Sequence, residues 1–331
     1  MADLRCPYCH TPLALVPLLE TPATAGSVRD LHKAAAVYST EQRVTGAWSA
    51  QWAPTAEAHL RRFVESGLKL DRTGVGEWKQ SLLADGKSPR TVNSHLATLG
   101  AFCQWLLARG ELFGDNPARG HTLRSKKVSA ADERLAFEPA EVQALLEAVA
   151  GAPHVGYSQL VWFMAYTGAR NEEVAQLRRG DVRQQDGIWV FDLTTMDEGQ
   201  RRKTSASRRL VPVHTRLQGS MGMQVRQPSE DPAESLLGLQ EQNGRWAYSA
   251  SRWVNDRVLP KLKKDGVVRD DKRLTLYSLR HSVTTQLKHK GIPEDLLAEL
   301  VGHTNSSMTT GRYGKRYPVG KLKEVVELIE W

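Results

Sequence analysis

Hydrophobic residues recur at helical spacing through the first half of the chain, and the clearest run lies between residues 88 and 110. Ser88 is suited to cap a helix and Pro89 to occupy its first turn, while Gly110 stands where such a helix would stop. Between them, one helical face collects the apolar residues Val92, Leu96, Leu99, Phe102, Cys103 and Leu106. Helical patterning from about residue 45 to residue 120 predicts an all-helical domain there.

Helical periodicity returns in the second half of the chain. The segment Phe137-Glu-Pro139 precedes a run with i, i+3, i+4, i+7 spacing at Val142, Leu145, Leu146 and Val149. A largely apolar helix is predicted over residues 160–166, and further helices over residues 278–289 and after Pro293. The tail after Tyr317 carries an apolar stripe that either docks on a neighbouring copy of the protein or packs on its own domain.

Two short runs in the second half have the composition of β-strands. They span residues 187–193 and 209–214, and the polar stretch between them is too long for a tight hairpin turn. A small sheet within a helical domain follows, so the predicted fold class is mainly α with a small β-sheet (α+β). We expect this second domain to cover residues 135–331.

The remaining segments lack a firm hydrophobic period. Residues 1–44 are predicted to be an N-terminal appendage whose fold the pattern does not reveal, and they are interrupted by Pro7, Pro12, Pro17 and Pro22. Residues 121–134 are polar and basic, and are predicted to be the linker between the two domains. Their positive charge comes in part from a group formed by Arg124, Lys126 and Lys127.

The composition fits a two-domain protein with a polyanionic partner. A chain of 331 residues corresponds to roughly two domains of about 150 residues each. Lys and Arg number 45 against 37 Asp and Glu, which gives a formal charge of +8 and favours a polyanion such as DNA. The longest apolar stretches fall short of the roughly 20 residues that cross a bilayer, and the N-terminus lacks the pattern of a signal peptide. We therefore expect a cytoplasmic protein with no membrane partner.

A tyrosine near the C-terminus, Tyr313, is accompanied by motifs that contain basic residues. These motifs are Thr167-Gly-Ala-Arg170-Asn-Glu-Glu173, Arg201-Arg-Lys203-Thr204, Leu276-Tyr-Ser-Leu-Arg280-His281, Leu300-Val-Gly-His303 and Arg312-Tyr313-Gly314. The hydroxyl of tyrosine has an unperturbed pKa of about 10. It therefore attacks phosphorus usefully only where cations favour its anion and neutralise the phosphorane. The basic motifs supply such cations.

Together, these motifs and their order resemble the tyrosine recombinase (phage integrase) family. The resemblance is strong for the motifs of the second domain and weak for the first domain. It implies that residues 45–120 form a helical core-binding (SAM-like) DNA-binding domain, and that residues 135–331 form the tyrosine recombinase catalytic domain. It also implies cleavage and rejoining of DNA through a 3′-phosphotyrosyl intermediate, with neither ATP nor a divalent ion as cofactor.

The resemblance assigns a role to each candidate residue of the site. Tyr313 is the nucleophile, and Arg170 and Arg280 grip the scissile phosphate. Lys203 protonates the departing 5′ oxygen, and a lysine flanked by arginines can have a lowered pKa that suits an acid. His303 hydrogen-bonds the phosphate or steadies the arginines.

The second domain also contains a departure from the family pattern and a competitor for the role of nucleophile. Tyr277 stands where the family usually has a histidine, and it either donates a hydrogen bond to the phosphate or packs under the helix. Tyr317 lies four residues after Tyr313 and is its chief competitor. Two other functions stay open, namely a sequence-specific DNA-binding protein that has lost the chemistry and a type IB topoisomerase.

Basic residues from both domains are predicted to contact duplex DNA and to give it a salt-sensitive affinity. The candidates are Lys87, Arg90, Lys126, Lys127, Arg201, Arg202 and Arg208. Arg201 or Arg202 replaces Lys203 as the acid if the register of the basic loop is different. The resemblance further implies a homotetramer on two DNA sites, accessory directionality or DNA-bending proteins, and integration or excision of a phage or other mobile element.

The N-terminal appendage contains the segment Cys6-Pro-Tyr-Cys9-His10, which has the spacing of half a zinc site or of a covalent haem attachment. A zinc site needs four ligands, and the nearest further candidate is His32. Reduced thiols are the alternative for these cysteines, and the resemblance also allows an arm-type DNA-binding segment within residues 1–44. Cys6 and Cys9 are therefore retained as candidates for metal binding, and no metal is predicted firmly.

Overall fold

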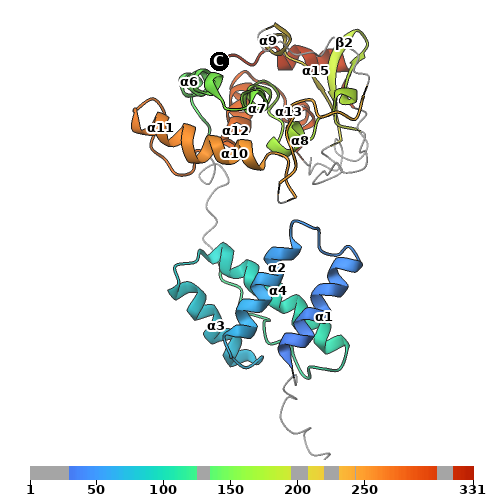
Figure 1. Ribbon diagram of the computed structural model, residues 1–331, viewed down its shortest axis with the longest axis vertical. Coiled ribbons are helices and arrows are strands. Elements are labelled where there is room, and N and C mark those ends of the chain that lie inside the picture. The colour runs from blue at the N-terminus through green and yellow to red at the C-terminus, as the bar shows by residue number, and fades with distance from the viewer. Residues whose placement is uncertain (1–29, 125–134, 195–207, 220–230, 243, 304–315) are drawn as a thin grey trace, which may run out of the picture. The chain divides into compact units, whose positions relative to one another are not determined.

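The chain forms two compact units, Met1–Lys127 and Val128–Trp331, in a computed structural model of the protein (Figure 1). The structure describes residues 30–124, 135–194, 208–219, 231–242, 244–303 and 316–331. The division between the units falls within residues 121–134, where the sequence predicts a linker.

The described part of the first unit is helical and has its own core. Its helices are α1 (Leu31–Val44), α2 (Ala53–Glu65), α3 (Arg72–Ala84) and α4 (Pro89–Ala108). Helix α4 begins as its sequence indicates, because the side chain of Ser88 accepts a hydrogen bond from the backbone N–H of Thr91 at 3.2 Å. Gly110 follows its end with a φ of 68°, so the predicted helix and both of its ends are confirmed.

Helix α1 lies before residue 45, where the sequence placed the start of the helical domain. Tyr38 of this helix is 3% exposed. The centroid of its ring lies 5.4 Å from the ring centroids of Trp48, Phe102 and Trp105. Such aromatic contacts bury a large apolar area. The packed unit therefore includes residues from at least Leu31 onwards.

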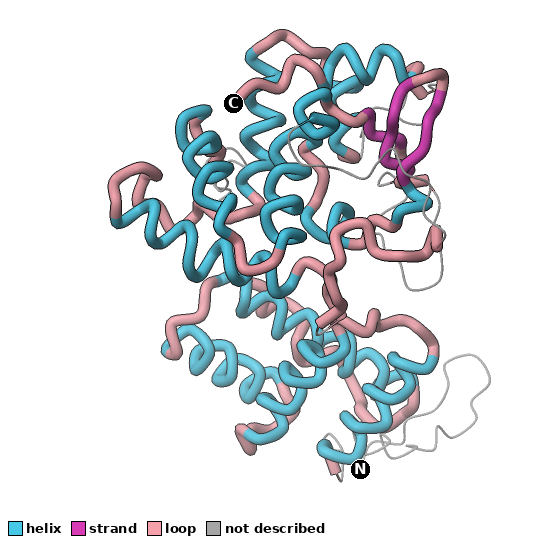
Figure 2. The backbone as a smooth tube through the Cα atoms, turned by 45° about the horizontal axis from the view of Figure 1, so that its top comes forward, coloured by secondary structure: helices cyan, strands magenta, loops and turns pink. Residues whose placement is uncertain are grey.

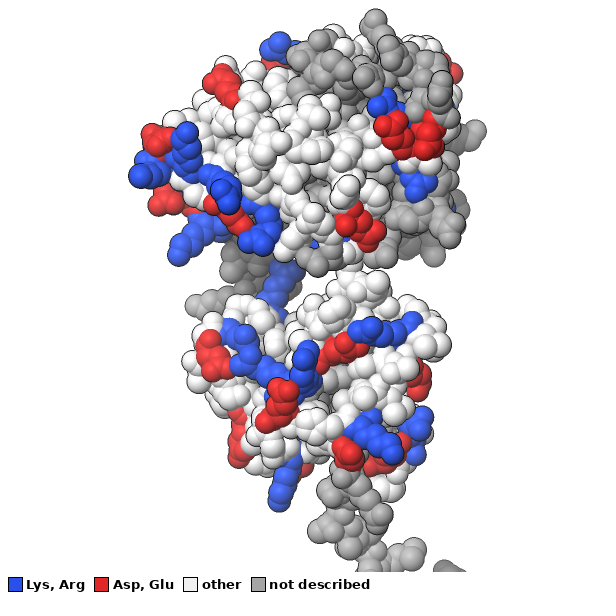
Figure 3. All heavy atoms as spheres, in the orientation of Figure 1, with Lys and Arg blue, Asp and Glu red and all other residues white. Residues whose placement is uncertain are grey.

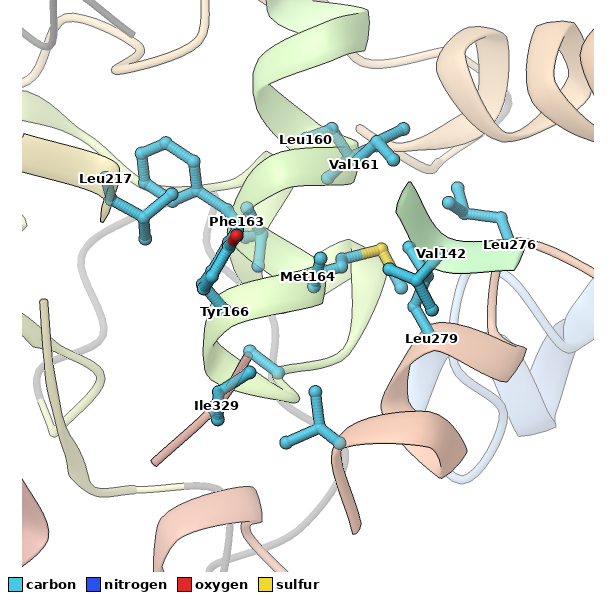
Figure 4. Close-up of a cluster of buried hydrophobic side chains, with 14 of the residues drawn as sticks. Val142, Leu160, Val161, Phe163, Met164, Tyr166, Leu217, Leu276, Leu279 and Ile329 are labelled. Carbon is cyan, nitrogen blue, oxygen red and sulfur yellow. The ribbon is translucent and has the colours of Figure 1, made fainter. Parts of the chain in front are cut away.

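The second unit is built around α7, whose side chains are buried on almost every side. Figure 4 shows Leu160, Phe163 and Met164 of this helix among side chains from segments distant in the sequence, including Val142, Leu217, Leu276, Leu279 and Ile329. The α-helices of this unit are α6 (Pro139–Ala148), α7 (Val155–Thr167), α8 (Asn171–Ala175), α9 (Thr215–Gly219), α10 (Tyr248–Trp253), α11 (Leu259–Lys264), α12 (Ser278–His289), α13 (Glu294–Val301) and α15 (Val319–Val326). Short 3₁₀ or π segments are η1 (Val149–Gly151), η2 (Arg179–Asp181) and η5 (Val254–Val258).

A three-stranded antiparallel sheet of order β1-β2-β3 lies at one edge of the second unit (Figure 2). The sequence predicted β2 (Ile188–Asp192) and β3 (Leu210–Pro212). It missed β1 (Val182–Gln185), because that strand is mostly polar and has no buried residue. A two-residue turn joins β1 to β2, and its residues Asp186 and Gly187 have φ values of 52° and 75°. Positive φ at both positions is typical of a type I′ hairpin turn.

The C-terminal tail packs on its own unit. Helix α15 contacts β2 and β3, and its Lys323 Nζ donates a hydrogen bond to the carbonyl of Val213 at 2.6 Å. The indole Nε1 of Trp331 donates to the carbonyl of Ala165 at 2.9 Å. Of the two sequence-based alternatives for the apolar stripe, the structure therefore has the one in which it covers its own domain.

These elements confirm the predicted fold class, which is mainly helical with a small sheet. Among the helices that the structure describes, none is long and apolar enough to cross a membrane.

Candidate active site

Arg170 is delivered by a sharp turn between α7 and α8. Helix α7 ends at Gly168, which has a φ of 62° and therefore a left-handed conformation that favours glycine. A Cβ at this position would lie 3.0 Å from Val283 Cγ1 and 3.2 Å from Val301 Cγ1. The turn therefore packs closely against α12 and α13, the helices that carry or precede the other candidate residues.

The side chain of Arg170 connects this turn to the end of α13. Its Nη1 donates a hydrogen bond to Glu173 Oε1 at 2.5 Å, and its Nη2 donates to the carbonyl of Gly302 at 2.9 Å. His303 is the next residue after Gly302 and is exposed. The structure thus brings together two candidate residues, Arg170 and His303, that are far apart in the sequence.

Arg280 lies on the buried face of α12 and is 1% exposed. Its Nη1 donates a hydrogen bond to the carbonyl of Gly168 at 2.7 Å. Its Nε and Nη2 are buried and have no hydrogen-bond partner among the residues that the structure describes. Burial, and then the positive charge of Arg170, lower the pKa of Arg280 to about 10. Because leaving buried donors unpaired is costly, this guanidinium is suited to accept an anion.

Tyr277 stands beside this guanidinium, directly before the first residue of α12. It is half-buried, and its ring meets the ring of His281 edge-on at a centroid distance of 5.4 Å. Its proximity is one of the influences on the pKa of Arg280. Three candidate residues of the second unit therefore lie close together, namely Arg170, Arg280 and Tyr277. His303 directly follows Gly302, whose carbonyl accepts the hydrogen bond from Arg170.

The sequence reasoning missed one residue of this network, Arg209. It is 2% exposed, and its Nε donates a hydrogen bond to the carbonyl of Leu300 at 2.7 Å. Its Nη2 donates to Glu173 Oε2 at 3.0 Å. Burial raises the pKa of Glu173, but Arg209 and Arg170 outweigh it and lower that pKa to about 2. Glu173 is therefore a buried carboxylate that stays ionised between two arginines.

A signal for Arg209 is present in the sequence. Arg209, Val211 and Val213 stand at positions i, i+2 and i+4, the spacing of one face of a strand, and all three are buried. Arg209 begins the predicted strand over residues 209–214 and directly follows basic residues, of which Arg208 is exposed. The phase of the strand, and not the local charge, separates these two neighbouring arginines.

Several candidate residues lie outside the described residues. They are Cys6, Cys9, Lys126, Lys127, Arg201, Arg202, Lys203 and Tyr313. Within the described ranges, no group of His, Cys, Asp and Glu residues could hold a metal ion.

Tyr317, the competitor of Tyr313, uses its hydroxyl within the fold. That hydroxyl donates a hydrogen bond to Asp295 Oδ2 at 2.6 Å. This hydrogen bond raises the pKa of Tyr317, which disfavours the phenolate that a nucleophile needs. The backbone N–H of Tyr317 also donates to Glu299 Oε1 at 3.2 Å.

The remaining described DNA candidates have accessible side chains. In the first unit, Arg90 is exposed and Lys87 is half-buried. Lys87 lies near the stacked rings of His59 and His95, whose centroids are 3.8 Å apart. Burial, His95 and Lys87 together lower the pKa of His59 to about 4. These two imidazoles are therefore neutral near pH 7 and add no charge to that surface.

Basic side chains also gather on one end of the second unit. Figure 3 shows Lys and Arg, interspersed with Asp and Glu, over the end that α11 occupies in Figure 1. The last turn of α11 contributes Lys261, Lys263 and Lys264. Such a surface favours an anionic partner.

Comparisons with known proteins place this site in a family context. Residues 136–318 match the model of the phage integrase family. The chain is 28% identical over 146 residues to a probable integrase/recombinase protein of Methanocaldococcus jannaschii, a match that covers 43% of this chain and 41% of that protein. It is 24% identical over 280 residues to a tyrosine recombinase of Thermosipho africanus, covering 76% of this chain and 90% of the relative. The structure is similar to that of lambda integrase in a tetramer bound to a Holliday junction, with a TM-score of 0.61, 16% identity, and coverage of 87% of this chain and 80% of that one.

Replacing Gly302 by alanine is expected to destabilise the protein more than an equivalent change elsewhere. Gly302 has a φ of 73°, and a Cβ there would lie 2.6 Å from Arg209 Nη1. Gly291 provides a matched control, because it has a φ of 77° and no neighbouring atom within 4 Å of its Cβ position. Gly291→Ala should cost about 1 kcal/mol through backbone strain alone, and Gly302→Ala about 1–3 kcal/mol more through overpacking. Equal losses in the free energy of unfolding, measured with denaturant, would contradict the close contact.

Replacing Glu173 by glutamine should destabilise the protein in a pH-dependent way. Loss of a buried charge between two arginines is expected to cost about 3 kcal/mol at neutral pH. The pKa of Glu173 is lowered from 4.5 to about 2, so the stability that its charge provides is present above about pH 5 and is lost as the pH falls towards 2. The difference between wild type and variant should therefore shrink over this range. Calorimetry at several pH values measures it, and Glu324→Gln, which removes an exposed pair with Lys321, serves as the control with little effect at any pH.

Proposed function

We propose that this chain, which belongs to the phage integrase family, is a site-specific DNA recombinase that cleaves and rejoins strands through a 3′-phosphotyrosyl intermediate. The observation that carries this proposal is the guanidinium of Arg280. It is buried, it lies beside the like charge of Arg170, and two of its nitrogens have no hydrogen-bond partner among the described residues. A phosphate would accept hydrogen bonds from these donors, and its negative charge would reduce the repulsion between the two arginines.

Arginine suits this task because its planar fork of N–H donors matches two oxygens of a phosphate. Arg170 and Arg280 approach from different elements, the turn after α7 and the helix α12. Donors that are fixed in advance stabilise the charge that develops on a phosphorane more than the charge of the ground state. Both arginines are therefore assigned to the non-bridging oxygens of the scissile phosphate.

Tyr313 is the proposed nucleophile. Its hydroxyl oxygen attacks the phosphorus, the bond from phosphorus to the 5′ oxygen breaks, and the hydroxyl proton leaves Tyr313. The products are a 3′-phosphotyrosyl ester and a free 5′ hydroxyl. After strand exchange, a 5′ hydroxyl attacks this ester and releases the tyrosine. One phosphodiester replaces another, so the exchange needs no energy from ATP. The hydrogen bond of Tyr317 to Asp295 supports the choice of Tyr313.

The other candidate residues assist this reaction. Lys203 donates a proton to the departing 5′ oxygen, and His303 hydrogen-bonds the phosphate from its place at the end of α13. Tyr277, beside Arg280, donates a hydrogen bond to a phosphate oxygen. A phenol cannot easily accept a proton near neutral pH, so Tyr277 is assigned no role as a base.

The DNA partner and the assembly follow from the same family. The helical domain, predicted over residues 45–120, holds duplex DNA with Lys87 and Arg90, and Arg208 contributes from the domain predicted over residues 135–331. A relative of similar fold, lambda integrase, is a tetramer bound to a Holliday junction. We infer that this chain likewise acts as a homotetramer on two DNA sites, with accessory directionality or DNA-bending proteins, to integrate or excise a phage or other mobile element.

A nicked suicide substrate should trap a covalent adduct that migrates slowly on a denaturing gel. Such a substrate loses a short fragment after cleavage, so the reverse reaction is prevented. Tyr313→Phe should abolish the adduct because it removes the attacking oxygen. Tyr317→Phe, which removes a hydroxyl bonded to Asp295, should retain it. Because a target site is needed, the duplex is first selected from a random pool by binding to the protein.

The outcomes of this experiment separate the alternatives. An adduct that persists in Tyr313→Phe and disappears in Tyr317→Phe would reverse the assignment. No adduct in the wild type, on a duplex that it binds tightly, would favour a DNA-binding protein that has lost the chemistry. Relaxation of supercoiled DNA without a defined site would favour a type IB topoisomerase.

Replacing Arg280 by methionine should slow cleavage by about two orders of magnitude or more, because it removes a transition-state contact. Binding of the duplex should change much less, since many phosphate contacts contribute to affinity. Single-turnover cleavage at saturating protein, with a separate gel-shift titration, measures the two effects. Arg252→Met is a control, because Arg252 is an exposed residue that pairs with Asp256. A cleavage rate within twofold of wild type in Arg280→Met would contradict the assigned contact.

A further inference from the structure

We propose that Arg209 is a positioning residue for the reaction, which sets the place of Arg170 and of the Gly302-His303 segment. This inference rests on the proposed function of the same site. Arg209 precedes the first residue of β3 and directly follows the basic loop that contains Lys203. Its side chain reaches both other segments, and so it connects three motifs that are separate in the sequence.

The geometry of the guanidinium accounts for this role. Its Nη2 donates to Glu173 Oε2 at 3.0 Å, and the other oxygen of that carboxylate accepts from Arg170 Nη1 at 2.5 Å. Its Nε donates to the carbonyl of Leu300 at 2.7 Å. One planar group therefore fixes Glu173, and through it Arg170, against the end of α13. Its Nη1 also lies so close to Gly302 that a Cβ there would be at 2.6 Å.

Stability alone gives a poor reason for this arrangement. A buried ion pair often contributes less than apolar residues of the same volume, since both charges lose their hydration. The pair of Arg209 and Glu173 is nearly inaccessible, with side chains that are 2% and 4% exposed. The pair instead fixes the direction of several hydrogen bonds. This matters for catalysis, because a misplacement of catalytic groups by about 1 Å lowers the rate roughly 100-fold.

Lysine at position 209 keeps the charge but removes the fork. A single ammonium cannot hold the carboxylate of Glu173 and the carbonyl of Leu300 in the same plane. The Arg170 guanidinium then loses its fixed partner. We expect Arg209→Lys to bind duplex DNA within about twofold of wild type and to cleave it about tenfold more slowly or worse at saturating protein.

A substrate with a methylphosphonate in place of the scissile phosphate distinguishes positioning from general damage. In this substrate a methyl group replaces a charged non-bridging oxygen, so less negative charge develops for the arginines to stabilise. The neutral methylphosphonate also repels the nucleophile less than a charged phosphodiester does. If Arg209 acts through Arg170, the loss of rate in Arg209→Lys should shrink from about tenfold to less than about threefold. A variant that is merely damaged loses the same factor on both substrates.

Controls complete the test. Arg269 lies away from the site and pairs with another buried carboxylate, that of Glu141, at 2.8 Å. Arg269→Lys should therefore lower the cleavage rates of the phosphodiester and the methylphosphonate by the same small factor. If Arg209→Lys does not fold, as judged by circular dichroism, Gly302→Ala displaces the same guanidinium without removing it, with Gly291→Ala as its matched control. The loss of rate in Gly302→Ala relative to Gly291→Ala is then expected to be smaller on the methylphosphonate than on the phosphodiester.

Three results would overturn the inference. They are an unchanged rate on the phosphodiester in folded Arg209→Lys, equal losses on both substrates in that variant, or equal behaviour of Gly302→Ala and Gly291→Ala. Failure of the proposed function looks different, because the wild type itself would then form no adduct on either substrate.

Discussion

The arrangement of the site depends on one buried carboxylate, Glu173, that stays ionised between Arg170 and Arg209. Burial of a charge is costly unless it is paired and hydrogen-bonded. Two arginines satisfy this carboxylate, and both also hold backbone carbonyls at the end of α13. The carboxylate therefore fastens the turn after α7, the start of β3 and the end of α13 to each other. No single helix of the unit could position all three segments.

The charge balance of this network explains why it suits an anion. Glu173 offsets part of the charge of Arg170 and Arg209, whereas Arg280 is 1% exposed and donates a hydrogen bond to the carbonyl of Gly168. Among the described groups, the influences on the pKa of Arg280 include two like charges, Arg170 and Arg209. A bound phosphate would supply the missing negative charge and the missing acceptors together. An anion at this place would therefore stabilise the arrangement.

Much of the fold could be predicted from the sequence because its signals are local. Helix α4 was predicted with its cap, and α6, α12 and α13 followed from apolar spacing. Strand β1 escaped prediction because its side chains are polar and its position is set by pairing with β2. Within the site, motifs located Arg170, Arg280 and His303. Arg209 was missed because the neighbouring sequence is basic, although it stands two and four residues before the buried Val211 and Val213.

The presence of Tyr277 changes how protons are expected to move in the proposed reaction. A histidine at this position could donate or accept a proton near neutral pH, whereas the phenolic O–H of tyrosine serves as a hydrogen-bond donor. Its ring lies against His281 and beside Arg280, so it can orient a phosphate oxygen without exchanging a proton with it. Proton transfer to the 5′ oxygen then falls to Lys203. In the proposed reaction the two arginines are consequently left to stabilise charge.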